Sequence, residues 1–312
     1  MSSKGWSALG AFDAAERSLA LDLLGFQRQL VFSTFTPTQY EGDRDTHLLY
    51  GGAMALTRAL VAFCADDDRL MPVAPLPMSD PARSAAAAAA AIELGVPALL
   101  VPSKPRSDLS PTHPDFDAVW GLLAEAGVPF MLHVGGGGES IARAYHNNGN
   151  PVKDWLGGGE NIRSKDLMVI HGGAEAFLSA MVLDGVFERF EGLHGGCIEL
   201  GAMWVVPWLR RLDIAQSTFV RSEPSLALPL AASEYAHRQL WFTPFPTEPV
   251  GWMIEQAGDD MFLFSSDYPH PEGGRDPLKH FEGSMEGVSE VSRERFYSGN
   301  FARMMRIDVP VR

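Results

Sequence analysis

Short apolar runs alternate with longer amphipathic segments along the chain. The runs that we expect to be buried strands lie at 28–35, 69–78, 97–104, 129–138, 195–202, 240–246 and 261–270. A period of about 3.6 residues predicts helices near 13–25, 49–65, 84–95, 114–126, 175–190, 203–216 and 249–257, and a mostly helical tail over 276–312. Continuous apolar strands separated by helices are typical of a parallel sheet covered by helices.

The number of strands favours a barrel over an open sheet. Seven strands come close to the eight of a TIM-type (β/α)8 barrel, and no glycine-rich dinucleotide fingerprint opens the chain. A length of 312 residues suits one such domain, and no repeat or linker divides it. We therefore expect an α/β barrel over 1–312, interrupted by a polar, Gly-rich segment at 139–173 that we interpret as a lid.

Composition and charge narrow the range of partners. The chain carries 39 acidic and 25 basic residues, a formal net charge of −14, which disfavours nucleic acid. The N-terminus lacks the apolar core of a signal peptide, and we find no apolar stretch of the about 18 residues that a membrane span requires. Cys64 and Cys197 lie in apolar runs, as reduced core cysteines do. These features indicate a cytoplasmic enzyme without a nucleic-acid or membrane partner.

Ionisable residues stand at the ends of three predicted strands. His133 follows one strand, Glu199 lies in another, and Asp267 ends a third, with His270 just beyond it. Catalytic groups of α/β barrels occupy the C-terminal ends of strands, so these side chains are expected to share a pocket. A histidine there can also be a hydrogen-bonded structural group. A buried carboxylate needs either an ion pair or a functional site, because burying it unpaired is costly.

Three further residues are candidates for the site. His171 precedes a helix, where it either takes part in catalysis or caps the helix. Trp155 and His146 lie in the predicted lid and, with His270, are expected to contact substrate. No H-E-x-x-H, C-x-x-C, G-x-S-x-G or EF-hand pattern occurs, and no two of the nine histidines are two residues apart. The sequence therefore lacks an H-x-H motif.

Three segments resemble the amidohydrolase-related family, in the branch that includes aminocarboxymuconate-semialdehyde decarboxylase. They are LHVGGGG at 132–138, the stretch at 184–213, and FLFSSDYPHPEG at 262–273. The resemblance implies that His133 binds a metal and that Asp267 binds it and deprotonates its water. Glu199 replaces the acid/base histidine of the decarboxylases. A carboxylate can transfer protons in its place if burial raises its pKa.

The resemblance also implies that the first barrel strand, which carries the other metal ligands, is absent. The count of seven strands agrees and would leave apolar edges at 28–35 and 261–266. Three explanations are open: the sequence begins late, residues 1–12 fill the gap, or another subunit does. We favour the first.

Three hypotheses for function follow. The leading one is a hydrolase of a small organic substrate, in which a divalent ion, most simply zinc, activates water. Asp267 would accept the proton of that water, while Glu199 or His171 would protonate the leaving group and complete a ligand set that needs three protein side chains. The second is a non-oxidative decarboxylase acting on a carboxylated substrate. The third is a metal-free barrel with a binding role. A homodimer is implied by the resemblance.

Overall fold

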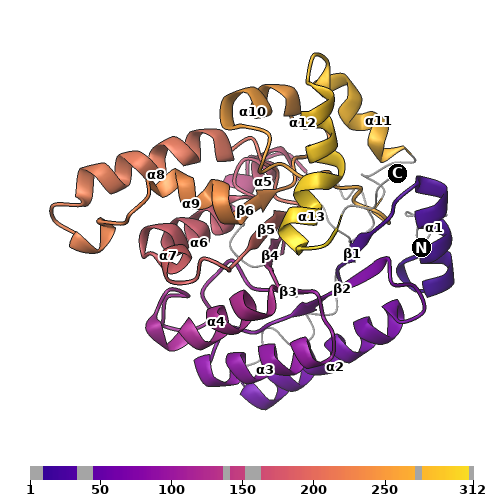
Figure 1. Ribbon diagram of the computed structural model, residues 1–312, viewed down its shortest axis with the longest axis horizontal. Helices are drawn as coiled ribbons and strands as arrows, with labels where there is room; N and C mark the ends of the chain where they lie inside the picture. Colours follow the sequence, from indigo (N-terminus) through magenta and orange to yellow (C-terminus); the bar gives the residue numbers. More distant parts are fainter. Residues whose placement is uncertain (1–9, 34–44, 136–140, 152–162, 271–275, 309–312) are drawn as a thin grey trace.

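Six parallel strands form one sheet that curls into an incomplete barrel (Figure 1). The structure is a computed structural model and describes residues 10–33, 45–135, 141–151, 163–270 and 276–308. The strands pair in chain order and are β1 (Gln29–Val31), β2 (Leu70–Pro75), β3 (Ala98–Leu100), β4 (Phe130–His133), β5 (Gly195–Ile198) and β6 (Leu240–Phe242). The prediction of a parallel barrel with a strand missing is confirmed.

Helices alternate with the strands along the chain, and most of them cover the outer face of the sheet. They are α1 (Ala14–Leu24), α2 (Thr46–Cys64), α3 (Pro81–Glu93), α4 (Asp117–Ala126), α5 (Ser164–Leu167), α6 (Gly172–Leu183), α7 (Val186–Arg189), α8 (Val205–Phe219), α9 (Ala232–Gln239), α10 (Val250–Ala257), α11 (Pro277–Glu282), α12 (Glu290–Glu294) and α13 (Asn300–Met305). The predicted helix at 175–190 is two helices, and α9 lies in a region that we expected to be irregular. Periodicity missed α9 because its buried face carries only Ala232, Tyr235, Ala236 and Gln239, which give little apolar repeat.

Local sequence explains where several helices begin and end. Helix α3 starts at Asp80, whose carboxylate accepts a hydrogen bond from the Arg83 amide at 2.9 Å, and Pro81 occupies its first turn. Helices α1 and α4 end at Gly25 and Gly127, which both adopt the left-handed conformation that glycine accepts at little cost. The sequence therefore determines these boundaries through short-range contacts.

The seventh predicted strand, at 261–270, is only an isolated bridge. Phe262 pairs with Phe242, and two hydrogen bonds accompany the bridge, from Phe242 N to Met261 O at 2.8 Å and from Leu263 N to Phe242 O at 2.9 Å. The amide of Phe264 donates instead to the carbonyl of Phe296 at 2.9 Å. The C-terminal helical segment therefore draws the chain away from the sheet and ends the pairing.

Every second side chain along the strands points into the barrel interior and fills it. Its members are Met71, Val73, Ala98, Met131, Ile198, Trp241 and Leu263, joined by Met304 and Met305 of α13. The alternate residues, such as Ala74, Leu132 and Phe242, face the helices in a larger cluster. This alternation is the normal geometry of a strand that is buried on both faces.

The barrel is open between β1 and the segment at 261–266. In the described part of the chain, β1 pairs with β2 alone, and the bridge at Phe262 lies at the other end of the sheet. A cavity of about 500 Å³ is lined by residues of both edges, including Gln29, Leu263 and Phe301. The cavity therefore extends from the gap between these two edges into the barrel interior.

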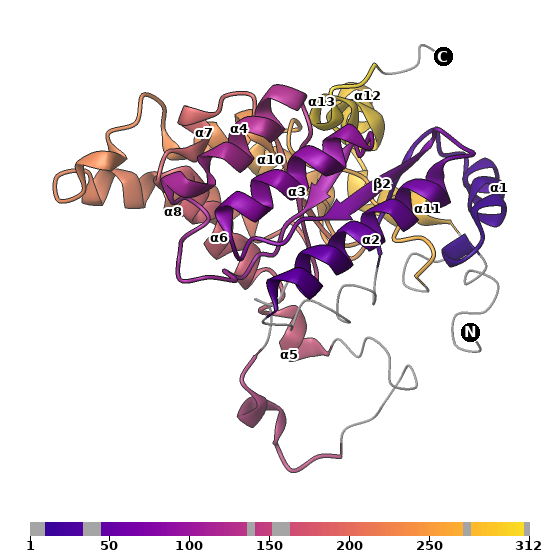
Figure 2. The same cartoon turned by 90° about the horizontal axis from the view of Figure 1, so that it is seen from below.

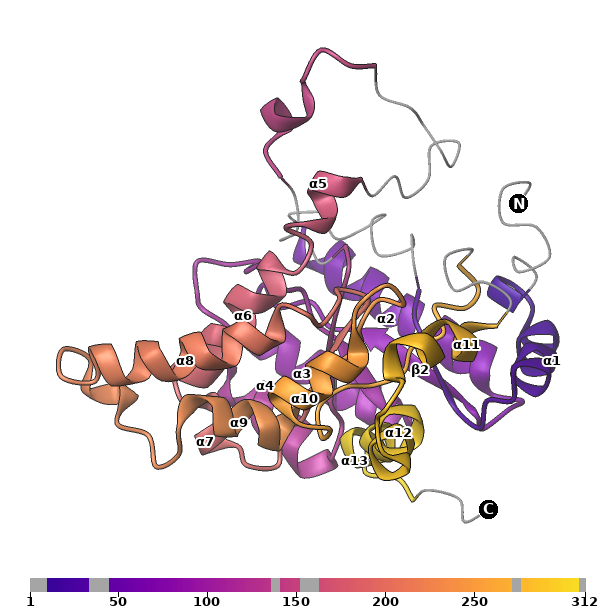
Figure 3. The same cartoon turned by 90° about the horizontal axis from the view of Figure 1, so that it is seen from above.

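The described part of the predicted lid extends away from the barrel. It contains the short helix η4 (Arg143–His146) and α5, which both stand off the strands in Figures 2 and 3. His146 Nε2 pairs with Asp166 at 2.9 Å, and Lys165 Nζ donates to the Tyr145 carbonyl at 2.5 Å. These contacts link the two ends of the segment to each other.

Two helical stretches are long and apolar enough to cross a membrane, judged by length and composition alone. They are Thr46–Cys64 and Ser164–Leu183, with mean hydropathies of 1.3 and 1.4. Our expectation that no stretch reaches this length was wrong by this measure. The first is α2, which buries Leu56 and Leu60, and the second joins α5 to α6, which buries Phe177. Core helices of globular proteins have the same composition, so the finding is weak evidence for a membrane span.

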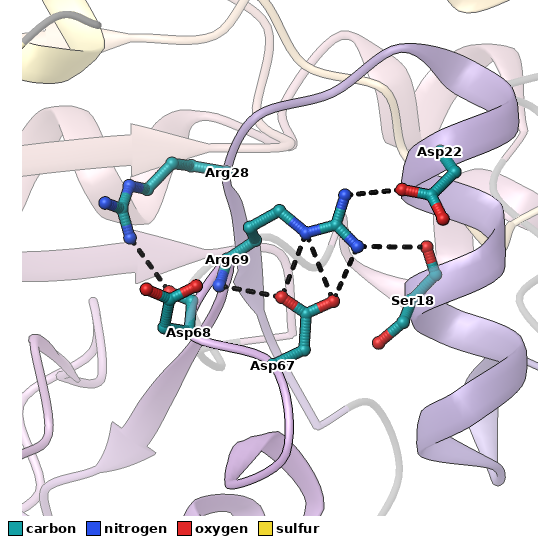
Figure 4. Close-up of polar contacts among 6 residues, drawn as sticks. All are labelled: Ser18, Asp22, Arg28, Asp67, Asp68 and Arg69. Carbon is teal, nitrogen blue, oxygen red and sulfur yellow. Dashed lines mark hydrogen bonds and ion pairs between the residues drawn. The ribbon is translucent and has the colours of Figure 1, made fainter.

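A cluster around Arg69 joins α1 to the start of β2 (Figure 4). The guanidinium donates to both carboxylate oxygens of Asp67 and to Asp22 Oδ1, the last at 2.6 Å. The ion pair holds the pKa of Asp67 well below its usual range, with the Arg69 hydrogen bond as the main cause. The cluster therefore fixes α1 against the end of the barrel that is opposite the strand exits.

Candidate active site

Four ionisable residues meet at the C-terminal ends of the strands. His133 ends β4, Glu199 follows β5, and Asp267 and His270 lie beyond the bridge at Phe262. All four line the cavity at the barrel opening. The structure therefore brings together the three strand-end residues that the sequence singled out.

Glu199 is the centre of this group. Its Oε2 lies 2.8 Å from His133 Nε2, and its Oε1 lies 3.6 Å from His270 Nδ1. His270 Nδ1 also lies 3.3 Å from Asp267 Oδ1. Each of the four side chains is less than a quarter exposed, so water screens these interactions weakly.

The backbone is left-handed at both carboxylates. Glu199 has a φ of 57° and Asp267 a φ of 53°, a conformation that costs a non-glycine residue about 1–2 kcal/mol. Strand alternation would turn Glu199 toward the helices, because its neighbour Ile198 faces the interior. The left-handed residue breaks the alternation and lets Glu199 line the cavity. Such strain is common at functional sites.

Neighbouring groups hold these residues in place. Thr243 Oγ1 accepts a hydrogen bond from the Glu199 amide at 2.9 Å. Nδ1 of His133 lies 2.9 Å from the Val134 carbonyl oxygen, and the Phe32 ring packs on the imidazole at 4.7 Å between centroids. The imidazole of His133 is therefore fixed at both nitrogens and on one face.

Electrostatics within the group favour the charged forms. Burial acts to raise the pKa of Glu199, but the hydrogen bonds from His133 and His270 outweigh it and lower that pKa. Hydrogen bonds to Asp267 and Glu199 raise the pKa of His270 to about 10. Burial opposes the charged form of His133, yet the Glu199 carboxylate raises its pKa overall. Glu199 is therefore ionised, which contradicts the premise that burial would make it a proton donor.

The same residues fit a divalent metal ion. Glu199, Asp267 and His270 each offer a ligand atom, and these atoms lie within 4.8 Å of one another. Ligands that share one ion lie roughly 3–4 Å apart, because each metal–ligand bond is about 2 Å long. Two carboxylates and an imidazole are donors that suit manganese or zinc. His270, expected to contact substrate, thus belongs to the candidate ligand set. His133, expected to bind the metal, is not one of these three residues and contacts Glu199 instead.

His171 and His146 do not line this cavity. His171 stacks on Trp204, with ring centroids 5.3 Å apart, and its Nε2 lies 3.4 Å from Glu175. His171 stands at the start of α6, as the capping interpretation had it, although its side chain makes no capping hydrogen bond. His146 pairs with Asp166 in the protruding segment. Trp155 lies outside the described residues.

Sequence reasoning missed the one buried charged residue among the other described residues that line the cavity. Arg17, in α1, is 4% exposed and lines the cavity. An arginine within an amphipathic helix normally faces solvent, so the pattern gave little reason to select it. The available signal was its position between Ala14 and Ala20 on the apolar side of α1.

Comparisons with known proteins agree with the fold. A family model described as Amidohydrolase matches residues 6–307. Among curated proteins, no sequence matches the chain significantly. An amidohydrolase from Mycobacterium avium subsp. paratuberculosis has a similar structure, with a TM-score of 0.76 and 22% identity over 96% of this chain and 75% of that chain.

Two decarboxylases also have similar structures. The 5-carboxyvanillate decarboxylase of Sphingomonas paucimobilis gives a TM-score of 0.68 and 21% identity, over 94% of this chain and 83% of that one. A 5-carboxyvanillate decarboxylase of Novosphingobium aromaticivorans, complexed with manganese and 4-hydroxy-3-methoxy-5-nitrobenzoic acid, gives 0.69 and 19%, over 93% and 79%. At these identities the similarity shows the fold.

Proposed function

The chain belongs to the amidohydrolase family, and from this membership and the site geometry we propose that it is a metal-dependent, non-oxidative decarboxylase of a small carboxylated organic molecule. The observation that carries the proposal is the cluster of Glu199, Asp267 and His270 at the wall of one cavity. The decarboxylases among its structural neighbours support this reaction over the hydrolysis that the sequence favoured.

A bound divalent ion would orient the substrate carboxylate and stabilise the negative charge that develops as carbon dioxide leaves. Glu199, Asp267 and His270 would hold this ion. Manganese is the ion that one structural neighbour contains, and zinc, which we expected from sequence, accepts the same donors.

The remaining residues would position the substrate and supply a proton. His133 lies on the cavity wall, and the Glu199 carboxylate raises its pKa. Once its Nε2 exchanges Glu199 for the substrate, it would donate a proton to the carbon that loses the carboxylate. The apolar side chains of Phe32, Ile198 and Leu263 line the same cavity and limit the access of water. This arrangement protects a carbanion-like centre from competing reactions.

Hydrolysis is the second candidate, because Asp267 stands in the cluster where a bound water would be deprotonated. The two reactions differ in their products. Decarboxylation releases carbon dioxide and exchanges the carboxyl group for hydrogen, whereas hydrolysis consumes water and releases no carbon dioxide.

The test combines metal analysis with product analysis. We expect about one manganese or zinc ion per chain by plasma mass spectrometry. We also expect carbon dioxide from a panel of hydroxybenzoates, lost after chelation and restored by the ion. Asp267→Asn should lower metal content and turnover together, while Asp260→Asn, outside the cavity, serves as the matched control. Carbon dioxide release that survives complete chelation would overturn the proposal, and so would a hydrolysed product without carbon dioxide.

A further inference from the structure

Arg17 is a buried cation in the wall of the cavity. Its side chain leaves α1 toward the barrel opening, and the residue is only 4% exposed. Its Nη1 donates to the Tyr268 carbonyl oxygen at 3.4 Å, which is long for such a bond. Its Nε is fully buried and has no hydrogen-bond partner.

No carboxylate among the described residues pairs with this guanidinium. Burial lowers the pKa of Arg17 to about 10, and only Tyr268 and Cys64 partly offset that effect. Arg69, by comparison, is 30% exposed at the opposite end of the barrel and is paired with both Asp67 and Asp22. A buried charge normally has a partner, because burying it alone is expensive. The missing partner of Arg17 is therefore expected to come from outside the described chain.

Tyr268 fixes Arg17 close to the candidate metal cluster. The guanidinium carbon lies 5.2 Å from the centre of the Tyr268 ring, an arrangement that orients the planar group. Tyr268 directly follows Asp267 in the chain, so the guanidinium is held one residue away from a candidate ligand. None of the three cluster residues is among the groups that shift the pKa of Arg17. The arginine is thus near the cluster but outside its ion-pair network.

A second polar group in the wall also lacks a partner. Gln29, on the β1 edge, has a buried Oε1 without a hydrogen bond, while its Nε2 lies 3.4 Å from Ser266 Oγ on the opposite edge. Gln29 and Ser266 both line the cavity with Arg17. Unsatisfied donors and acceptors in one wall are typical of a site that completes its hydrogen bonds with a ligand.

We infer that Arg17 binds a carboxylate group of the molecule that occupies this cavity, at a position separate from the metal cluster. Because Nη1 already donates to Tyr268 and Nε is fully buried, Nη2 is the guanidinium nitrogen left to donate to a carboxylate oxygen in the cavity. That the occupant is a carboxylated substrate rests on the proposed function. The presence of an anion-binding arginine does not depend on it.

The test measures ligand binding to metal-free protein. Benzoate, its neutral analogue benzamide, and inorganic phosphate are titrated by calorimetry after removal of metal. We expect benzoate to bind at least tenfold more tightly than benzamide or phosphate. Arg17→Met should weaken benzoate binding at least tenfold. Arg28→Met removes a positive charge from the same cavity lining, but Arg28 is exposed and already donates to the Asp68 carbonyl, so it should change the affinity by less than twofold.

Each outcome decides the proposal. Equal losses in the two variants, or no loss in Arg17→Met with an unchanged circular dichroism spectrum, would overturn it. If Arg17→Met fails to fold, the wild-type comparison decides: benzamide binding as tightly as benzoate refutes the anion site. Phosphate binding as tightly as benzoate refutes the carboxylate assignment, and the absence of binding by any probe refutes both. Metal-free protein and unreactive ligands keep these results independent of the proposed activity.

Discussion

Replacing Glu199 by glutamine removes the negative charge between two imidazoles and keeps nearly the same shape. We expect Glu199→Gln to lower the free energy of unfolding of metal-free protein by about 3 kcal/mol at pH 7. The estimate follows from the pKa of Glu199, which falls from 4.5 to about 2 in the folded protein, at about 1.4 kcal/mol for each pH unit.

The burial of the group justifies using that value with little reduction. The side chains of Glu199, His133 and His270 are 19%, 14% and 12% exposed, so solvent screens their attraction only slightly. Removing one partner of a buried ion pair typically costs about 3–5 kcal/mol. The lower end applies here, because an imidazole can lose its proton near neutral pH when its carboxylate is gone.

Urea unfolding in the presence of a chelator, followed by tryptophan fluorescence, measures the change. Asp260→Asn is the matched control, since Asp260 pairs with His237 at 3.2 Å but both side chains are 33% exposed. We expect this control to lose less than about 1 kcal/mol. If the two variants lose equal stability, burial does not set the strength of the Glu199 ion pairs, and the reasoning fails.

Two further predictions concern stability away from the site. Asp67→Asn should destabilise the protein at pH 6 and progressively less toward pH 3. Arg69 holds the folded-state pKa of Asp67 low, so the ionised carboxylate contributes stability above about pH 4, and this contribution is lost as the pH falls. A difference in thermal midpoint that does not change with pH would contradict this. Gly195→Ala should lower the free energy of unfolding by about 1–3 kcal/mol, because the new Cβ would overlap the Phe130 ring. Gly51→Ala should raise it by up to about 1 kcal/mol in the same thermal assay, because Gly51 lies on an exposed helix face and no atom lies within 4 Å of the new Cβ.

Periodicity predicted most of the fold. The runs that contain β1 to β6 were recognised because strands buried on both faces are continuously apolar, and seven helices were recognised by their 3.6-residue period. Both signals are local. The strand predicted at 261–270 did not form because of a contact that is distant in sequence. The Phe264 amide donates to the Phe296 carbonyl, more than thirty residues away, and not to a neighbouring strand.

The grouping of His133, Glu199 and Asp267 was also predictable. Parallel strands of a barrel end at the same rim, so residues that follow different strands meet there whatever their separation in sequence. The same rule gave no information on His171, which precedes a helix and stacks on Trp204 instead of entering the cavity. Position in the chain indicates the rim but not the direction of a side chain along it.

What the sequence by itself determined is the order of strands and helices and the presence of ionisable side chains at the strand exits, because both follow from spacing along the chain. Tertiary structure alone decided the chemistry of those side chains. The left-handed backbone turned Glu199 into the cavity, two imidazoles kept it ionised against the effect of burial, and the packing of α1 buried Arg17. Side-chain direction and proton affinity depend on neighbours in space, and residues distant in sequence supply those neighbours.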